Sequence, residues 1–122
     1  MWQSVWSWLK SPLKELGKAT AKAILQEAGD KLQEEVKKFA AAKGSIAVDA
    51  AFDKFQVGAL AAVKFAFFLS ASMKAKVNAI IQSEGDVWQA KIKGMVEQQD
   101  YAGLDIAFDA MQDLLKVRID SL

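Results

Sequence analysis

Carboxylates are the side chains of this sequence whose spacing could support chemistry. Three groups recur at intervals of four residues or stand next to each other: Asp105, Asp109 and Asp113; Asp49 and Asp53; Glu34 and Glu35. Paired acids can transfer protons or bind hard cations, but both functions need a concave site or oxygen ligands from several elements. A row of acids along one helix edge provides neither. We therefore interpret these carboxylates as a solvated face or as partners for lysines.

Other reactive side chains and binding motifs are missing from the sequence. It has no His and no Cys among its 122 residues, which excludes Ser-His-Asp and Cys-His catalysis, thiolate zinc sites and disulfides. Glycine-rich phosphate-binding motifs and the EF-hand loop are also absent. We predict a protein that is not an enzyme, with no catalytic residues, no metal ligands and no cofactor, and we infer no small-molecule substrate.

Charge is distributed unevenly along the chain, although the net charge is only +1. Residues 1–26 hold four Lys and one Glu, whereas residues 97–120 hold six acidic residues, one Lys and one Arg. The lysine row Lys10 to Lys22 could therefore pair with the acidic row Asp105 to Asp113, within one chain or between copies in a homo-oligomer. Exposed pairs contribute about 0–1 kcal/mol each and would set orientation more than affinity. Because Arg118 is the only Arg among 16 basic residues, nucleic acid is not expected as a partner.

Helix signals cover most of the chain. Alanine is abundant and there is one proline, a composition that favours helix over sheet. Ser11-Pro12 predicts the start of a long helix that ends at Gly44-Ser45, where a second long helix begins and runs to about Ser83, before Gly85. Gly29 lies inside the first helix, where it favours a bend or a close contact with another helix.

Two shorter helices are predicted after the long pair. Asp86 can cap a helix that ends near Gln98, and Asp100 can cap the last helix. The last helix carries a clean apolar stripe: Leu104, Phe108, Met111, Leu115 and Ile119. We predict an all-α fold, a small bundle in which two long helices form an antiparallel hairpin and two shorter helices cover the second. Residues 11–122 are predicted to be a single helical domain.

Residues 1–10 form a tryptophan-rich amphipathic N-terminal segment. The apolar residues that define it are Trp2, Trp6, Trp8 and Leu9, and a row of lysines recurs at intervals of four: Lys10, Lys14, Lys18 and Lys22. On a helix Trp2, Trp6 and Leu9 share one side and the lysines share another. Trp prefers the membrane interface and Lys is attracted to anionic head groups. The same residues could instead pack on the protein's own core or on a partner, so the segment is the predicted membrane or partner interface.

The stretch Val57–Met73 is the most apolar part of the chain. It contains one charge, Lys64, in 17 residues, and as a helix it would be about 26 Å long, just short of the ~30 Å bilayer core. It can be interpreted as a membrane span or as the buried centre of a bundle, and we favour the buried helix. Small residues recur along it at intervals of four and predict a ridge for close helix packing: Gly58, Ala62, Ala66 and Ser70.

These patterns favour a non-enzymatic protein that works by association. The leading hypothesis is a membrane-associating or assembly protein that acts through the amphipathic N-terminal helix and the apolar central helix. Its size is compatible with an accessory component of a virion or envelope complex. Membrane association is favoured over a cytoplasmic location. The alternative is a soluble helical-bundle adaptor or regulator that binds a partner protein through the N-terminal helix.

Overall fold

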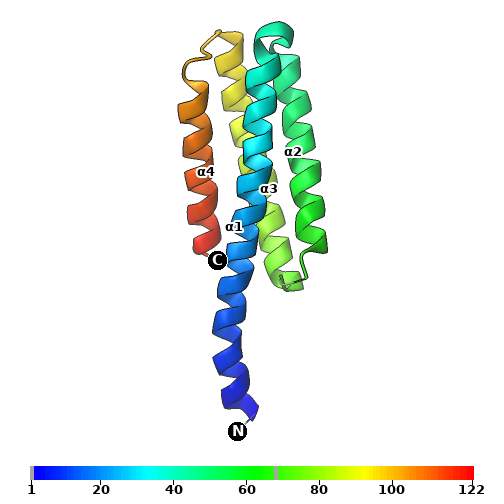
Figure 1. The fold of residues 1–122 in the computed structure, drawn as a ribbon, viewed down its shortest axis with the longest axis vertical. Coiled ribbons are helices and arrows are strands. Elements are labelled where there is room, and N and C mark those ends of the chain that lie inside the picture. The colour runs from blue at the N-terminus through cyan, green and yellow to red at the C-terminus, as the bar shows by residue number, and fades with distance from the viewer. Residues whose placement is uncertain (1, 68) are drawn as a thin grey trace.

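The protein is an all-α bundle, as predicted. Its described residues form four helices in up-down-up-down order (Figure 1). The computed structural model describes the backbone of residues 2–67 and 69–122 and the side chains of residues 14–67 and 69–122. The helices are α1 (Trp2–Lys43), α2 (Ser45–Phe65), α3 (Ala71–Glu97) and α4 (Leu104–Asp120). Helix α1 packs against α2 and α4, and α3 packs against the same two helices.

The first hairpin turns at Gly44, as predicted. Helix α1 ends at Lys43 and α2 begins at Ser45, so Gly44 is the single residue between them. Its φ of +65° lies in the left-handed region, which glycine adopts without the steric cost that a Cβ brings. The Gly44 N–H donates to the Ala40 carbonyl at 2.8 Å. This bond satisfies one of the last carbonyls of α1.

The prediction of one helix from Ser45 to about Ser83 is wrong, because the chain reverses inside the apolar stretch. Helix α2 ends at Phe65, and Ala66 has an extended conformation with ψ of 101°. Helix α3 starts after Ser70, whose hydroxyl accepts a hydrogen bond from the Met73 N–H at 3.1 Å. Neither Gly nor Pro stands at this turn, so the N-cap and the packing of α2 on α3 define it. The stretch 57–73 is therefore a helical hairpin and not a single buried helix.

Gly85 lies inside α3 and does not end a helix, so the predicted helix start at Asp86 is also wrong. Gly85 is buried, and a Cβ placed there would lie 2.6 Å from Nε2 of Gln56 on α2. The Gln56 amide occupies that space and donates to Asp86 at 3.2 Å. Gly85 thus lets α2 and α3 approach closely, and a helix tolerates glycine there because packing offsets its low propensity.

The core runs along the facing stripes of all four helices. The predicted stripe of α4 is buried throughout: Leu104, Phe108, Met111, Leu115 and Ile119. Helix α1 contributes residues from Ala21 to Ala40, and Phe52 of α2 is among the largest fully buried side chains. Gly29 of α1 is buried against the amide of Gln112 on α4, which confirms the predicted close helix contact.

A polar cluster joins α3 to α4 at the edge of this core. Arg118 donates to Glu84 at 2.6 Å, and the indole N–H of Trp88 donates to the same carboxylate at 3.2 Å. The Glu84 side chain is only 14% exposed. Two charge-assisted bonds therefore satisfy a carboxylate that is largely withdrawn from water.

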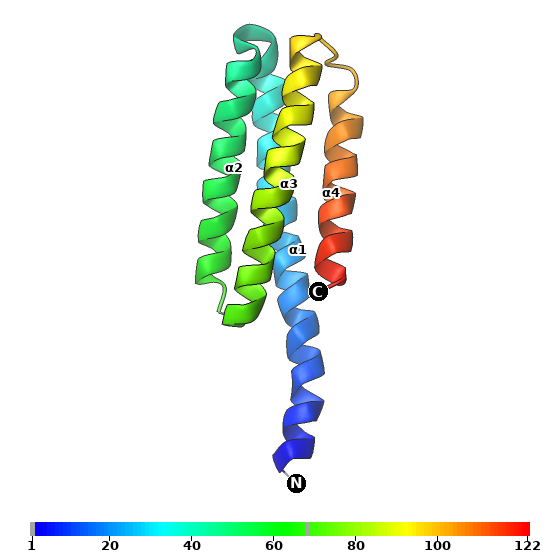
Figure 2. The same cartoon turned by 180° about the vertical axis from the view of Figure 1, so that it is seen from behind.

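Helix α1 is much longer than the bundle, and its N-terminal part extends beyond it (Figures 1 and 2). At 1.5 Å per residue a helix of 42 residues is about 63 Å long, against about 32 Å for the 21 residues of α2. The predicted helix start at Ser11-Pro12 is wrong, since α1 already begins at Trp2. Within the part of the chain that the structure describes, no helix combines the length and the apolar character that a membrane span requires.

Candidate functional site

The most distinctive surface lies at the end of the bundle from which α1 extends. Three parts of the chain meet there: the N-terminal part of α1, the turn between α2 and α3, and the C-terminus that follows α4 (Figure 2). We call residues 2–16 the projecting segment and the described residues 65–67, 69 and 70 the α2–α3 turn. The other end of the bundle is formed by the α1–α2 and α3–α4 connections.

The predicted interface residues belong largely to the projecting segment. Side chains of Trp2, Trp6, Trp8, Leu9 and Lys10 lie outside the described residues, and their place in the structure is known only through the backbone of α1. Lys14 is exposed, and Leu16 is 42% exposed. Gly17 is the first buried residue of α1 in the described part of the chain. The bundle therefore begins to cover α1 at about this position.

The predicted lysine row is divided between the bundle and the projecting segment. The Lys18 ammonium donates to the Asp120 carbonyl at 2.9 Å, and Lys22 donates to the Asp120 carboxylate at 2.8 Å. Both lysines thus neutralise the C-terminal end of α4, where carbonyl dipoles and a carboxylate concentrate negative charge. Lys14 lies one turn beyond this contact and remains exposed.

Helices α1 and α4 do pair through charge within the chain, but mostly not through the residues predicted. Asp105 lies 3.0 Å from Lys37 and accepts a hydrogen bond from Gln33 at 2.7 Å. Those bonds lower the pKa of Asp105 below its ordinary value of 3.8, with the bond from Lys37 as the largest cause. Asp109 and Asp113 are exposed on α4. Their predicted pairing with the row Lys10 to Lys22 is not observed among the described side chains.

Asp49 of α2 has a matching role on the other side of the bundle. It accepts hydrogen bonds from Gln89 at 2.8 Å and from Lys93 at 2.9 Å, both on α3. These bonds lower the pKa of Asp49, with the bond from Gln89 as the largest cause. A general acid at neutral pH needs a raised pKa. Asp49 and Asp105 are instead held as anions that connect neighbouring helices.

The α2–α3 turn exposes large aromatic side chains that the sequence pattern assigned to the core. Phe65 is 77% exposed and Phe67 is 83% exposed, whereas Leu69 is buried. The Lys64 ammonium lies 5.7 Å from the centroid of the Phe65 ring. Lys74 donates to the Lys64 carbonyl at 2.7 Å, which brings a second ammonium to the end of α2. The turn thus combines exposed aromatic area with positive charge.

The predicted ridge of small residues does not lie on one helix. Gly58 and Ala62 are on the exposed face of α2, whereas Ala66 follows the end of α2 and Ser70 caps α3. No atom lies within 4 Å of a Cβ placed on Gly58, so no described part of the chain packs against this position. The ridge prediction failed because the period of four was continued through the turn.

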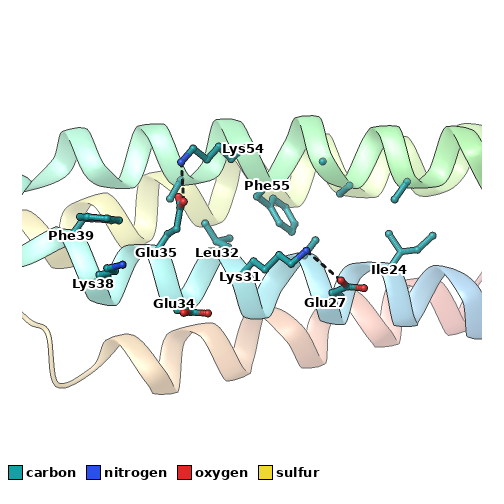
Figure 3. A pocket seen from close by; sticks show the side chains of 15 residues that line it. Ile24, Glu27, Lys31, Leu32, Glu34, Glu35, Lys38, Phe39, Lys54 and Phe55 are labelled. Carbon is teal, nitrogen blue, oxygen red and sulfur yellow. Dashed lines mark hydrogen bonds and ion pairs between the residues drawn. The ribbon is translucent and has the colours of Figure 1, made fainter.

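Gly58 and Ala62 instead line a groove of about 660 Å³ between α1 and α2 (Figure 3). Ile24 and Phe55 are among the apolar side chains that line it. Charged pairs follow its edge: Glu35 with Lys54 at 2.8 Å and Glu27 with Lys31 at 3.2 Å. The acidic and basic groups alternate, so the groove has no dominant charge. Among the side chains described, no group of three or more acids could hold a metal ion.

No known protein family matches this chain, and comparisons with curated proteins and with solved structures also found no significant match. Its function has to be argued from its own residues. Sequence reasoning located the projecting segment but missed the α2–α3 turn beside it. The signal for the turn was Ser70, a preferred N-cap residue three positions before Met73, inside a stretch that hydrophobicity alone made continuous.

Proposed function

We propose that this protein is a non-enzymatic, peripheral membrane-binding protein that attaches to anionic lipid surfaces through the projecting segment. The observation that carries the proposal is the extension of α1 beyond the bundle (Figure 1). Helical periodicity along this extension separates an apolar side with Trp2 and Trp6 from a side with Lys10 and Lys14. A helix of this kind binds in the plane of a membrane interface.

The chemistry of the two sides supports reversible attachment. Trp places a largely apolar ring and one polar N–H at the boundary between acyl chains and head groups. Each lysine near an anionic surface contributes about 1 kcal/mol, an attraction that salt weakens. Because Lys18 and Lys22 already bind the end of α4, we assign the contact with lipid to the two N-terminal lysines of the row, Lys10 and Lys14.

Vesicle flotation tests this proposal with the full chain. We expect the protein to float with vesicles of phosphatidylcholine and phosphatidylserine at low salt, and to remain in the soluble fraction with phosphatidylcholine alone or at high salt. The double substitution Trp2→Ser/Trp6→Ser should lower the partition coefficient by on the order of tenfold or more, because it removes the apolar anchor. Lys14→Gln should weaken binding, whereas Lys31→Gln, on the exposed face of the bundle, should not.

Two outcomes would overturn the membrane assignment. One is a full-length protein that stays entirely in the soluble fraction with anionic vesicles at low salt. The other is a chain that never floats but loses a protein partner when Trp2 and Trp6 are replaced. The second result would favour an adaptor that uses the same helix in a protein groove.

A further inference from the structure

The α2–α3 turn is a second apolar and basic surface at the end from which α1 extends. Figures 1 and 2 show the turn beside α1, close to where the projecting segment leaves the bundle. The two parts are separated by some fifty residues of sequence, and the fold brings them to the same end. The sequence of the projecting segment does not require the turn to lie at the same end of the bundle. The turn is therefore an independent observation.

The aromatic side chains of the turn are exposed to solvent and do not contribute to the core of the bundle. Phe65 and Phe67 are 77% and 83% exposed, although buried Leu69 between α2 and α3 shows that apolar side chains can be covered here. Val57, on the outer face of α2, is 69% exposed as well. Monomeric soluble proteins seldom gather exposed large apolar side chains, and such patches mark interaction sites.

Along the chain on either side of the turn, the charged residues are all basic. No acidic residue occurs between Asp53 and Glu84, an interval that contains four lysines: Lys54, Lys64, Lys74 and Lys76. The Lys74 ammonium is held beside the turn by its hydrogen bond to the Lys64 carbonyl, and Lys76 is exposed. Exposed phenylalanines next to lysines have the composition of interfacial anchors that insert aromatic rings below anionic head groups. A partner with an acidic surface and an apolar interior fits, and an anionic bilayer has both.

We propose that the α2–α3 turn inserts Phe65 and Phe67 into the same anionic membrane that the projecting segment binds, so that the bundle stands with this end on the lipid. This inference rests on the proposed function and adds a second anchor and an orientation to it. The 15 residues of the segment make about 22 Å of helix at 1.5 Å per residue, and the segment projects beyond the turn (Figures 1 and 2). The projecting segment and the turn can therefore contact the same membrane surface only when α1 bends where it leaves the bundle.

The sequence of α1 contains the residues at which such a bend is easiest. Pro12 has no N–H to bond the carbonyl four residues before it, and Gly17 has the lowest helix propensity apart from proline. Gly17 is also where burial by the bundle begins. Bending between these residues lays the amphipathic segment in the membrane plane and leaves the four-helix bundle unchanged.

Site-specific fluorescence tests the second anchor directly, because the chain has no native cysteine. Ala71→Cys, exposed at the start of α3 beside the turn, and Ala42→Cys, exposed near the opposite end, give matched labelling sites. With an environment-sensitive dye, phosphatidylserine-containing vesicles should shift the emission from position 71 to the blue and leave position 42 unchanged. Equal responses at both positions, or none at position 71 in a protein that floats, would overturn the proposal.

Substitutions separate the second anchor from the first. Phe65→Ser/Phe67→Ser should reduce partitioning into anionic vesicles by on the order of tenfold, whereas the control Ile46→Ser/Ile106→Ser should not. The control residues are 74% and 75% exposed, so neither variant removes core packing, which thermal unfolding can verify. If the Phe variant floats like the wild type while Trp2→Ser/Trp6→Ser does not, this inference fails and the proposed function stands. If soluble inositol hexaphosphate reproduces the shift at position 71, the turn is an anion site and the membrane anchor is refuted.

Discussion

At the residue scale, two glycines that both lie inside α-helices have opposite roles in this protein. Gly29 is buried where α1 meets α4, and a Cβ there would overlap the amide of Gln112. Gly58 is exposed on α2 with no atom within 4 Å of a Cβ. From the sequence, each of these glycines was predicted to allow the close approach of another helix. Only the packed structure tells which one is required.

We predict opposite effects of alanine at these two glycines. Gly29→Ala should lower the free energy of unfolding by about 1–2 kcal/mol, because the buried Gln112 amide has to leave its place and its bond to the Gln26 carbonyl. Gly58→Ala should raise it by about 0.5–1 kcal/mol, through helix propensity alone. Urea titrations measure both values. If Gln112→Ala is combined with Gly29→Ala, the two changes should couple favourably, and strict additivity would contradict the contact.

At the scale of helices, two aspartates connect the bundle on opposite sides. Asp49 joins α2 to α3 through Gln89 and Lys93, and Asp105 joins α4 to α1 through Gln33 and Lys37. Both carboxyls have a pKa below the ordinary 3.8 in the folded state. The unfolded chain therefore binds protons more readily than the native one at mildly acidic pH.

This difference predicts an acid-sensitive contribution to stability. The contribution of each lowered carboxyl pKa is complete above the ordinary value of 3.8 and is lost as the pH falls through the lower pKa of the folded state. Asp49→Asn/Asp105→Asn should therefore flatten the decline of the urea midpoint below about pH 4. Asp109→Asn, an exposed site on α4, serves as the control. An unchanged acid limb in the double variant would show that these bonds add nothing to folding.

The sequence predicts which segments are helical far better than it predicts where the helices begin and end. The hairpin at Gly44 and the apolar stripe of α4 follow from local chemistry, a left-handed glycine and a period of 3.6, and both are confirmed. Gly85 carries the same signal as Gly44 but admits the Gln56 side chain of α2 instead. The end of α2 at Phe65 has no glycine or proline, and it depends on tertiary packing that no local pattern contains.

At the scale of the whole molecule, the sequence could supply the parts of the candidate site but not their assembly. The projecting segment was visible as a pattern of Trp and Lys, because amphipathicity is a local property. Phe65 and Phe67 were assigned to a buried helix, since apolar residues in an uninterrupted run give no sign of the turn that exposes them. That the two surfaces share one end follows only from the up-down-up-down order of the helices (Figure 1).

Because α1 is divided into a part inside the bundle and a projecting part, we predict that two N-terminal deletions have different effects on stability. Removing residues 2–13 should change the thermal midpoint by no more than about 2–3 °C, because the described core contacts of α1 begin at Ala21 and its bonds to α4 begin at Lys18. Removing residues 2–22 should lower the midpoint far more, since it deletes Ala21 and both lysines that bind Asp120.

Thermal unfolding followed by circular dichroism, together with flotation of the same two proteins, tests this division. The shorter deletion should keep a cooperative transition and lose most of its binding to phosphatidylserine vesicles, retaining what the α2–α3 turn provides. If it loses the cooperative transition instead, the segment is part of the folding unit. A free amphipathic helix would then no longer explain its tryptophans, because side chains needed for the bundle are not available to lipid.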